Sequence, residues 1–567
     1  MATIVVRYDR LPVNRDRLNL TALSHQRLML VMLLIIAISS VLVLRLIWMG
    51  LASGESSRLG YAFGDLPPRA DIVDRNGVPL ARTMDGYAIS VRPGRVLGDA
   101  DELARKLHEI FPDTPASEFH ARLTGKGWGY LRKRALPEEV AAVNALGEVG
   151  IEFPREKERV YPQRTLAAHV LGFVPTKDGQ AWNGGMGVEA AFNDRLTDGA
   201  KRGEPLALSI DSRVQGALES ELYTAMVDQS AHGATGIVLD ANTGEVIAMA
   251  SFPVFDPNKL GGDPRPRRND VVQSRYELGS TFKPLAVAAA MDAGTIRSMA
   301  KRYDATAPIQ VGRYKIKDDH PLGRWINVPE VLIHSSNIAT ARIADEMGAE
   351  PMQKLYRALE FDRRPSVELK ERAWPLWPVE WGRITNMTVA YGHGIAVTPL
   401  HLASAYAALV NGGIWRPATV LRLKEEDVPK GRRVFTAATS ARMLQLLRMI
   451  VVDGTGKNAD APGYRVGGKT GTAEKPTAGG YAHRANITTF AAAFPMDNPK
   501  YVMVAMMDEP QGSKQFPGVR TAAYTSAPVV KRAVMRIGPM LGIMPDERRD
   551  VDVSELMPLL AQEEGEE

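Results

Sequence analysis

The sequence predicts an α+β protein. An N-terminal membrane helix precedes an extended mixed domain and then a domain with an antiparallel sheet of about five strands beside a helical subdomain. An uncharged apolar run near the N-terminus predicts the membrane helix. Strand–turn–strand patterns at 233–253 and 464–510 predict the antiparallel sheet, because tight turns join the strands. The long segment 270–450 between them carries mostly helical patterns, which places a helical subdomain beside that sheet.

Length and composition indicate a multidomain globular protein. At 567 residues the chain exceeds one ordinary hydrophobic core, and its 45% hydrophobic and 24% charged content fits a folded chain. A net charge of +5 without a dense basic block indicates no nucleic-acid partner. The chain has no cysteine, which excludes disulfides, thiolate metal sites and cysteine nucleophiles. None of its ten histidines stands at metal-ligand spacing, so we expect no metal site and interpret His169 and His393 as structural.

The N-terminus predicts a single membrane anchor. Residues 28–44 contain no charge, and the apolar character continues beyond Arg45. About 20 apolar residues cross the hydrocarbon layer, so we expect a transmembrane helix at 28–49 and a cytoplasmic tail at 1–27. The positive-inside rule sets this orientation, because the tail holds arginines at positions 7, 10, 15, 17 and 27. A cleaved signal peptide ending near LASGESS is the alternative, but the length of the run favours an uncleaved anchor.

The rest of the chain is expected to divide near residue 205. Residues 50–205 predict a mixed domain without obvious catalytic side chains, with a hairpin turning at Asn76-Gly77. Residues 206–545 carry the strand patterns and the helical segment. The acidic end, 546–567, is predicted to be disordered.

A first candidate motif lies in YELGSTFKPLAVAAAMDAG, residues 276–294, where Ser280 and Lys283 open an alanine-rich helix. Capping is the alternative interpretation, with Ser280 as the N-cap and Lys283 as a solvated first-turn lysine. Positions three apart share one helix face, with about 5–6 Å between Cβ atoms, so the amine can reach the hydroxyl. For the amine to act as a base, burial or a second cation must disfavour its charged form.

Two further segments contain candidate catalytic residues. Lys469 lies in VGGKTGT, where a plain edge strand is the alternative, although such glycines often mark the close approach of another backbone. Because side chains alternate along a strand, we expect Lys469 and Thr470 to share one pocket only if the strand is distorted there. Ser335 and Asn337 precede a helix, and here the alternative is an ordinary cap formed by Asn337.

Together the motifs carry a family resemblance. Ser-x-x-Lys, Ser-x-Asn and Lys-Thr-Gly occur in that order within one expected domain, a set similar to that of penicillin-binding proteins and class A β-lactamases. GSTFKP, SSN, GHGIAVTPLHLASAYAALVNGG and GGKTGTAEK resemble the transpeptidase domain of class B penicillin-binding proteins. RADIVDRNGVPLA, YPQRTLAAHVLGF and GVEAAFNDRL resemble their non-catalytic pedestal, so the resemblance covers roughly residues 69–540. Leu278 stands where proline is common in the family, and Gln163-Arg164 replaces a glycine-containing turn.

The resemblance implies a fold and a set of catalytic residues. The fold is a serine β-lactamase/transpeptidase-like domain at 206–545 behind a pedestal/dimerisation domain. Ser280 would attack the penultimate D-Ala carbonyl of a stem peptide ending in D-Ala-D-Ala. Lys283, neutral through burial and crowding by Lys469, would take the proton. Ser335 would relay a proton to the leaving amine, and Asn337 would hold Lys283 and the substrate amide.

The resemblance also implies how substrate is held. Lys469, Thr470 and Thr472 would bind the terminal carboxylate, with Gly471 on the same strand. The backbone N–H groups of Ser280 and Thr472 would form the oxyanion hole. No metal or organic cofactor is required for this acyl transfer.

Partners and location follow from the same resemblance. The ligands would be peptidoglycan stem peptides and β-lactam inhibitors, and the partners a polytopic lipid II polymerase and other divisome membrane proteins. The chain would cross the bacterial inner membrane once, with the N-terminus in the cytoplasm and the catalytic domain in the periplasm.

Several alternatives stay open at this level. VGRYKIKDDHPLGRWINVPEVLIHSSNIA and the total length resemble the division-septum enzyme, penicillin-binding protein 3 type, more than the elongation-specific transpeptidase. A mainly scaffolding divisome protein with weak D,D-carboxypeptidase activity is a second alternative. Hydrolysis of β-lactams is a third, but a class A hydrolase would carry Glu-x-x-x-Asn between 337 and 469, and that stretch has no match.

Overall fold

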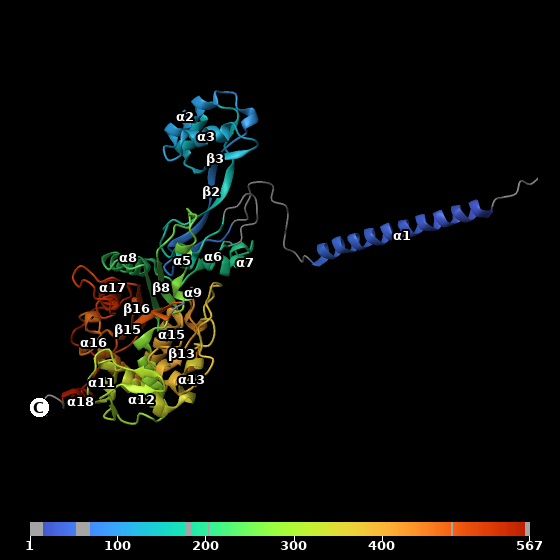
Figure 1. Cartoon of the computed structure of the whole chain (residues 1–567). Helices are drawn as coiled ribbons and strands as arrows, with labels where there is room; N and C mark the ends of the chain where they lie inside the picture. Colours follow the sequence, from blue (N-terminus) through green and yellow to red (C-terminus); the bar gives the residue numbers. More distant parts are fainter. Residues whose placement is uncertain (1–14, 53–68, 176–183, 202, 478–479, 562–567) are drawn as a thin grey trace, which may run out of the picture. The chain divides into compact units, whose positions relative to one another are not determined.

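The computed structural model describes residues 15–52, 69–175, 184–201, 203–477 and 480–561 (Figure 1). The chain divides into two compact units, Met1–Phe63 and Gly64–Glu567. Residues 1–14 of the expected cytoplasmic tail and residues 53–68, near the start of the expected 50–205 domain, lie outside the described residues.

Helix α1 (Arg15–Ala52) is long and apolar enough to cross a membrane. Its segment Arg27–Arg45 has a mean hydropathy of 2.7, and none of it is buried against protein. At 1.5 Å per residue this segment is about 28 Å long, close to the thickness of the hydrocarbon layer. The helix begins earlier than the expected span at 28–49, so the later part of the expected tail is helical.

Residues 69–207 of the second unit form the pedestal. Its six-stranded sheet has the order β3-β2-β1-β6, and β4 and β5 also pair with β2. The predicted hairpin at Asn76-Gly77 joins β1 to β2, and Gly77 has a φ of +84°, where glycine carries no Cβ penalty. Strand β6 pairs in parallel with β1, so the pedestal sheet extends just past the expected boundary at 205. The strands are β1 (Ile72–Val73), β2 (Pro79–Val91), β3 (Gly129–Ala135), β4 (Ile151–Glu152), β5 (Arg155–Val160) and β6 (Leu206–Ala207).

The far end of β2 carries a small core of its own. Leu107, Phe111 and Phe119 are buried there together with Ile89 and Val91 of the strand. Figure 1 shows α2, α3 and β3 gathered at this end of the unit. The pedestal helices are α2 (Ala100–Ile110), α3 (Ala116–Leu123), α4 (Pro137–Asn144), α5 (Ala168–Leu171), α6 (Gly187–Ala191) and α7 (Asn193–Thr197), with the 3₁₀ turn η1 (Pro93–Arg95).

The C-terminal domain contains the five-stranded antiparallel sheet that the sequence predicts. Its order is β15-β16-β17-β7-β8, so the last three strands in the chain continue the sheet begun by the first two. The edge strand β15 pairs on one side only, with β16. The strands are β7 (Gly233–Asp240), β8 (Val246–Phe252), β15 (Gly467–Thr477), β16 (Gly480–Phe494) and β17 (Tyr501–Asp508).

Both faces of this sheet are covered. Val238 packs in one core with Leu218 of α8 and Val530 of α17, whereas the neighbouring Ile237 packs in the other core with α15. Successive side chains of a strand point to opposite faces, which explains why β7 is buried almost throughout. The covering helices are α8 (Ser212–Asp228), α15 (Pro399–Val410) and α17 (Ser526–Met540).

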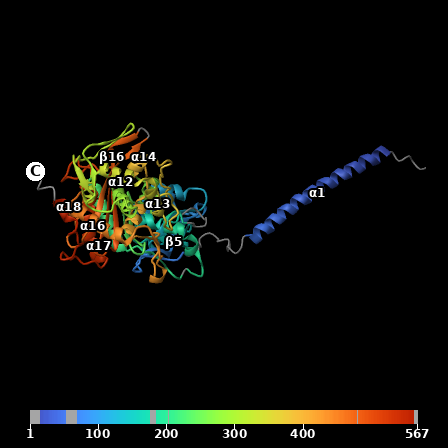
Figure 2. The ribbon, with the colours of Figure 1, turned by 90° about the horizontal axis from the view of Figure 1, so that it is seen from below.

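The helical subdomain lies between β8 and β15 in the chain, as the sequence predicts. Helix α10 is buried from Lys283 to Ala290, so its alanines allow other helices to approach closely. Figure 2 views this end of the molecule from below, with α12, α13 and α16 labelled. The helices are α9 (Asp270–Gln273), α10 (Lys283–Asp292), α11 (Val328–Ile333), α12 (Asn337–Met347), α13 (Ala349–Ala358), α14 (Arg383–Val389) and α16 (Ala437–Val452), with the 3₁₀ turns η2 (Arg265–Arg267), η3 (Gly279–Phe282), η4 (Glu425–Asp427) and η5 (Lys457–Ala459). The short strands are β9 (Arg302–Asp304), β10 (Ile309–Val311), β11 (Tyr314–Ile316), β12 (Trp325–Asn327), β13 (Ile414–Trp415) and β14 (Arg432–Arg433).

The C-terminal segment differs from the expected disordered tail. Residues 546–561 are ordered against the domain and end in α18 (Met557–Ala561). Leu556 is 1% exposed, Asp550 pairs with Arg448 of α16 at 2.7 Å, and Asn327 donates to the carbonyl of Leu559. An acidic composition did not prevent docking because the acids meet arginines on α16; residues 562–567 lie outside the described residues.

Candidate active site

Ser280 lies in the 3₁₀ turn η3, immediately before α10. Gly279 has a φ of +54°, and a Cβ built there would stand 2.9 Å from the carbonyl oxygen of Thr472 on β15. A Cβ on Gly392 would stand 2.3 Å from the carbonyl oxygen of Gly279. Backbone thus presses on both sides of the turn, which glycine alone permits, and Ser280 is held beside the edge strand.

Lys283 and Lys469 meet at one hydroxyl. The Nζ of Lys283 donates to the Oγ of Ser335 at 3.1 Å and also to its carbonyl oxygen. The Nζ of Lys469 donates to the same Oγ at 2.9 Å. Both lysines are fully buried. Three residues that lie far apart in the sequence therefore form one polar cluster inside the domain.

Burial lowers the pKa of Lys283 to about 7, and the negative charges of Asp318 and Asp319 oppose that shift. Burial also lowers the pKa of Lys469 well below its ordinary value, and the neighbouring Lys283 lowers it further. Crowding by Lys469 was expected to lower the pKa of Lys283, but burial is the main cause for both lysines, and it is the pKa of Lys469 that the neighbouring lysine lowers. Because the two amines share one hydroxyl, protonation of one disfavours protonation of the other, and the pair titrates as a unit.

Ser335 occupies a strained backbone conformation between α11 and α12. Its φ of +61° is a left-handed value that a residue with a Cβ adopts at a cost of order 1–3 kcal/mol. The strain turns the chain so that the Ser335 hydroxyl and carbonyl both face the lysines. Strain of this kind is concentrated at functional sites.

Lys469 and Thr470 share one pocket without a distorted strand, so that expectation is wrong. The β15–β16 register runs without interruption from Gly467 to Glu474. The long side chain of Lys469 instead curls back, so that its Nζ reaches the Oγ1 of Thr470 at 3.2 Å. The strand does approach another backbone, since a Cβ on Gly471 would stand 2.5 Å from the Leu278 carbonyl.

Asn337 is placed differently from both interpretations of it. The N-cap of α12 is Ser336, whose Oγ accepts the N–H of Ala339, so the capping interpretation of Asn337 is wrong. The side-chain amide of Asn337 donates to the carbonyl of Lys317 at 3.1 Å rather than to Lys283. Asn337 therefore ties the start of α12 to the segment after β11.

Thr472 and Thr470 lie along the outer edge of the sheet. The Oγ1 of Thr472 accepts the N–H of Ala522 at 3.1 Å. An edge strand presents N–H and C=O groups that no neighbouring strand uses, and such an edge accepts an extended peptide. The structure thus brings Ser280, Lys283 and Ser335 close to the β15 residues Lys469, Thr470, Gly471 and Thr472.

Two residues next to the site were not predicted from the sequence. The Oγ1 of Thr455 lies 2.8 Å from the Oγ1 of Thr470 and 3.5 Å from the Nζ of Lys469. Asp318 accepts hydrogen bonds from the Oγ of Ser336 and the N–H of Ile338, which fixes the start of α12. A threonine in a loop and an aspartate after a short strand have no local pattern that marks them, because their roles depend on long-range contacts.

Within the described residues, no group of three or more His, Asp or Glu side chains could hold a metal ion.

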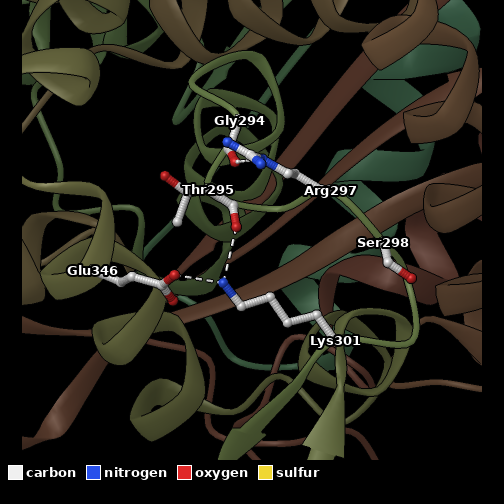
Figure 3. Close-up of a pocket in the computed structure, with 6 residues that line it drawn as sticks. All are labelled: Gly294, Thr295, Arg297, Ser298, Lys301 and Glu346. Carbon is white, nitrogen blue, oxygen red and sulfur yellow. Dashed lines mark hydrogen bonds and ion pairs between the residues drawn. The ribbon is translucent and has the colours of Figure 1, made fainter.

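A surface hollow of about 350 Å³ follows the C-terminal end of α10, at the opposite end of the helix from Ser280. Figure 3 shows its Lys301 side chain directed at Glu346 and at the carbonyl of Thr295, at 2.5 and 2.9 Å. The ammonium in the hollow is thus already paired, and we assign no catalytic role to it.

Comparisons with known proteins agree with this arrangement. Residues 234–534 match the penicillin-binding protein transpeptidase domain, and residues 65–204 match the penicillin-binding protein dimerisation domain. The chain is 39% identical over 507 residues to the probable peptidoglycan D,D-transpeptidase FtsI of Caulobacter vibrioides, covering 88% of this chain and 85% of that protein.

More distant relatives extend the same picture. The peptidoglycan D,D-transpeptidase FtsI of Escherichia coli K12 is 29% identical, with 86% of each chain covered. The crystal structure of penicillin-binding protein 3 from Mycobacterium tuberculosis in complex with aztreonam superposes with a TM-score of 0.66 at 26% identity, covering 85% of this chain and 98% of that one. With its paired dimerisation and transpeptidase domains, the chain belongs to the class B penicillin-binding proteins of the FtsI or penicillin-binding protein 3 type.

Proposed function

We propose that this protein is a peptidoglycan D,D-transpeptidase that cross-links stem peptides at the division septum and is acylated by β-lactams. One observation carries the proposal: two buried lysine amines share the Ser335 hydroxyl beside the turn that holds Ser280. A lysine with a pKa of about 7 is half neutral at physiological pH, which is what a general base requires.

Acylation begins at Ser280. Its Oγ attacks the carbonyl carbon of the penultimate D-Ala while neutral Lys283 accepts the hydroxyl proton. The backbone N–H groups of Ser280 and Thr472 stabilise the oxyanion, and each such donor is worth about 2.7–4 kcal/mol. The C–N bond then breaks, and the proton passes from Lys283 through the Ser335 hydroxyl to the departing D-Ala amine.

Transfer reverses the proton path. The amino group of a neighbouring stem peptide attacks the acyl-enzyme ester and gives its proton through the same relay to the Ser280 oxygen. A new amide bond forms and the free serine returns. The proton taken from Ser280 leaves on the D-Ala amine, and the acceptor amine supplies the proton that restores the serine, so the two steps balance without a change in oxidation state.

Substrate is held along β15. The terminal carboxylate lies against Lys469, Thr470 and Thr472, and the peptide adds to the open edge of the strand at Gly471. Asn337 contacts the substrate amide. A β-lactam occupies the same groups and leaves Ser280 acylated.

The septal role rests on the relatives. Two of the similar proteins described above are named FtsI, and the relative from Caulobacter vibrioides is named a probable peptidoglycan D,D-transpeptidase. Depletion of this protein is expected to produce filamentous cells, whereas rounded cells would instead indicate the elongation-specific role.

Helix α1 indicates where in the cell the protein is located. We propose a single pass through the bacterial inner membrane, with residues before α1 in the cytoplasm and the catalytic domain in the periplasm. By the resemblance to the division-septum enzyme, a polytopic lipid II polymerase and other divisome membrane proteins are its proposed partners.

The direct test is labelling with a fluorescent penicillin. The wild-type protein is expected to be labelled covalently and Ser280→Ala to give no label. Ser298→Ala is a matched control, because that serine lies beyond the opposite end of the same helix. Persistent labelling of Ser280→Ala, with its thermal unfolding unchanged, would refute the assignment of the nucleophile.

A further inference from the structure

A second cavity lies between the pedestal and the C-terminal domain. Its volume is about 140 Å³, and its walls come from both domains. It is lined by Arg134, Arg159, Tyr161, Val174, Pro257, Asn258 and Leu260. The catalytic groups described above are absent from this lining, so the cavity is distinct from the candidate active site.

One polar atom of the lining residues lacks a partner. The Arg159 side chain is 2% exposed, and its Nε and Nη1 donate to Glu189, to the carbonyl of Ala70 and to Thr83. Its Nη2 has no hydrogen-bond partner among the described residues. A buried guanidinium N–H without an acceptor is costly, and so this atom requires an acceptor from outside the protein.

The other polar groups of the lining are already occupied. The Tyr161 hydroxyl donates to Glu189 and accepts the N–H of Val174. The side chain of Asn258 exchanges two hydrogen bonds with the backbone of Tyr161, at 2.9 and 3.0 Å. The cavity therefore offers donors to a ligand and offers it almost no free acceptor.

The local charge favours an anion over water. Arg134 and Arg159 are the two charged side chains that line the cavity, and the glutamates that pair with them, Glu158 and Glu189, are not part of that lining. Arg134 stands at the rim, with its side chain 36% exposed and its Nη1 making only long contacts to Asn258, at 3.3 and 3.4 Å. Two guanidinium groups, one buried and one at the rim, thus face a single small cavity.

We propose that this cavity is a binding site for a small monocarboxylate. A planar carboxylate accepts one N–H from Arg159 Nη2 and one from Arg134, since guanidinium geometry matches two acceptor oxygens. Val174, Pro257 and Leu260 give apolar walls for a short alkyl group. The bound acid ties β3 and β5 of the pedestal to the 257–260 segment of the C-terminal domain.

The probe is fluoroacetate, observed by ¹⁹F NMR relaxation with the full chain in detergent. Measurements use protein already acylated by benzylpenicillin, so that the carboxylate-binding groups of the candidate active site are occupied. Acetate is expected to displace the probe, whereas chloride and inorganic phosphate at equal ionic strength are not. Equal displacement by chloride would overturn the carboxylate assignment, and an absence of probe relaxation would overturn the site.

Variants locate the binding. Arg134→Gln removes the rim guanidinium, and Leu260→Trp fills the mouth from a partly exposed position; each is expected to weaken fluoroacetate binding about tenfold or more. Arg159→Lys keeps the charge beside Glu189 but removes Nη2, and it is expected to weaken binding similarly. The matched control is Arg164→Gln. The Arg164 side chain is 72% exposed and lies outside the cavity lining, so this variant is expected to bind fluoroacetate as the wild type does.

Failure of this proposal is separable from failure of the proposed function. Loss of penicillin acylation would refute the proposed function but leave the Leu260→Trp comparison measurable on unacylated protein. Wild-type binding by both Arg134→Gln and Leu260→Trp, with each variant acylated normally, would overturn the cavity as the carboxylate site.

Discussion

Two buried cationic clusters in this molecule have opposite electrostatic designs. In the pedestal, Arg69 and Arg159 both pair with Glu189, at 2.9 and 2.7 Å, and all three side chains are at most 2% exposed. In the C-terminal domain, Lys283 and Lys469 are equally buried but meet on a neutral serine hydroxyl.

The difference separates a structural cluster from a reactive one. Burial lowers the pKa of Arg69 while Glu189 opposes the shift, and an arginine stays charged in either case. Lysine is different, because its pKa falls readily when it is buried without a paired carboxylate. The pedestal therefore keeps its charges and uses them for cohesion, whereas the C-terminal domain releases protons and can use the free amines.

The largest expected effect is on acylation. Lys283→Met removes the base while keeping an unbranched buried chain, and general-base removal typically slows a reaction by about 10²–10⁴-fold. We expect fluorescent penicillin labelling to slow by that amount with no loss of thermal stability. Lys301→Met, a lysine paired with Glu346 on the surface, is the control and should label normally. Rapid labelling of Lys283→Met would remove the distinction between the two clusters.

The counterpart in the pedestal is Glu189→Gln. It leaves two buried guanidinium groups without their charge partner, which costs about 3–5 kcal/mol in the free energy of unfolding. We expect denaturant unfolding to report that loss while the folded fraction is still acylated at the wild-type rate. Glu204→Gln, at an exposed ion pair with Arg195, is the control, with an expected change of about 0–1 kcal/mol. A stability change no larger than that of the control would show that the pedestal cluster is not cohesive.

The pH dependence distinguishes the clusters in a third way. With a folded-state pKa of about 7, Lys283 is mostly protonated at pH 6 and mostly neutral at pH 8, so acylation should accelerate across that interval. Its pKa is about 10.4 in the unfolded chain, so between these values the unfolded state binds more protons and stability rises with pH. Stopped-flow acylation and unfolding measurements between pH 6 and 9 test how the acylation rate and the free energy of unfolding change with pH. In Lys283→Met, the part of the rise in unfolding free energy that comes from Lys283 should be absent. A flat acylation profile would contradict the lowered pKa.

The smallest expected effect concerns Thr455. Thr455→Val keeps the volume but removes the hydroxyl beside Thr470 and Lys469, and a neutral hydrogen bond contributes about 0.5–1.5 kcal/mol. We expect acylation to slow by about two- to tenfold, with stability changed by no more than that energy. Thr306→Val, at an exposed threonine bonded to Asp304, should leave acylation unchanged. Unaltered kinetics in Thr455→Val would place Thr455 outside the working site.

The sequence allowed much of the fold to be predicted, for a physical reason in each case. The β7–β8 pair and the strands β15 to β17 carry runs of apolar residues joined by turn residues, which is local information. The docked segment at 546–561 was missed because its order depends on Arg448 and Asn327, each of which lies more than a hundred residues from its partner in the sequence. Composition alone cannot show that an acidic segment will find these partners.

The candidate site divides in the same way. The residue types and their order in Ser280, Lys283, Ser335 and Lys469 are visible in the sequence, and the structure gathers them. The expected contact between Asn337 and Lys283 was not found, and Lys469 reaches Thr470 without the distortion of β15 that a shared pocket was expected to require. Both outcomes depend on where a long side chain ends. Thr455 and Asp318 became visible only through contacts between distant segments.

The amino-acid order by itself determined the apolar N-terminal helix, the strand and turn pattern and the identity of the candidate site residues, because these depend on neighbours along the chain. Tertiary structure alone decided that two amines share one hydroxyl, that both are buried, and that the Nη2 of Arg159 in the pedestal has no acceptor among the described residues. Desolvation and charge proximity set these properties, and both are functions of distance in space rather than of separation along the chain.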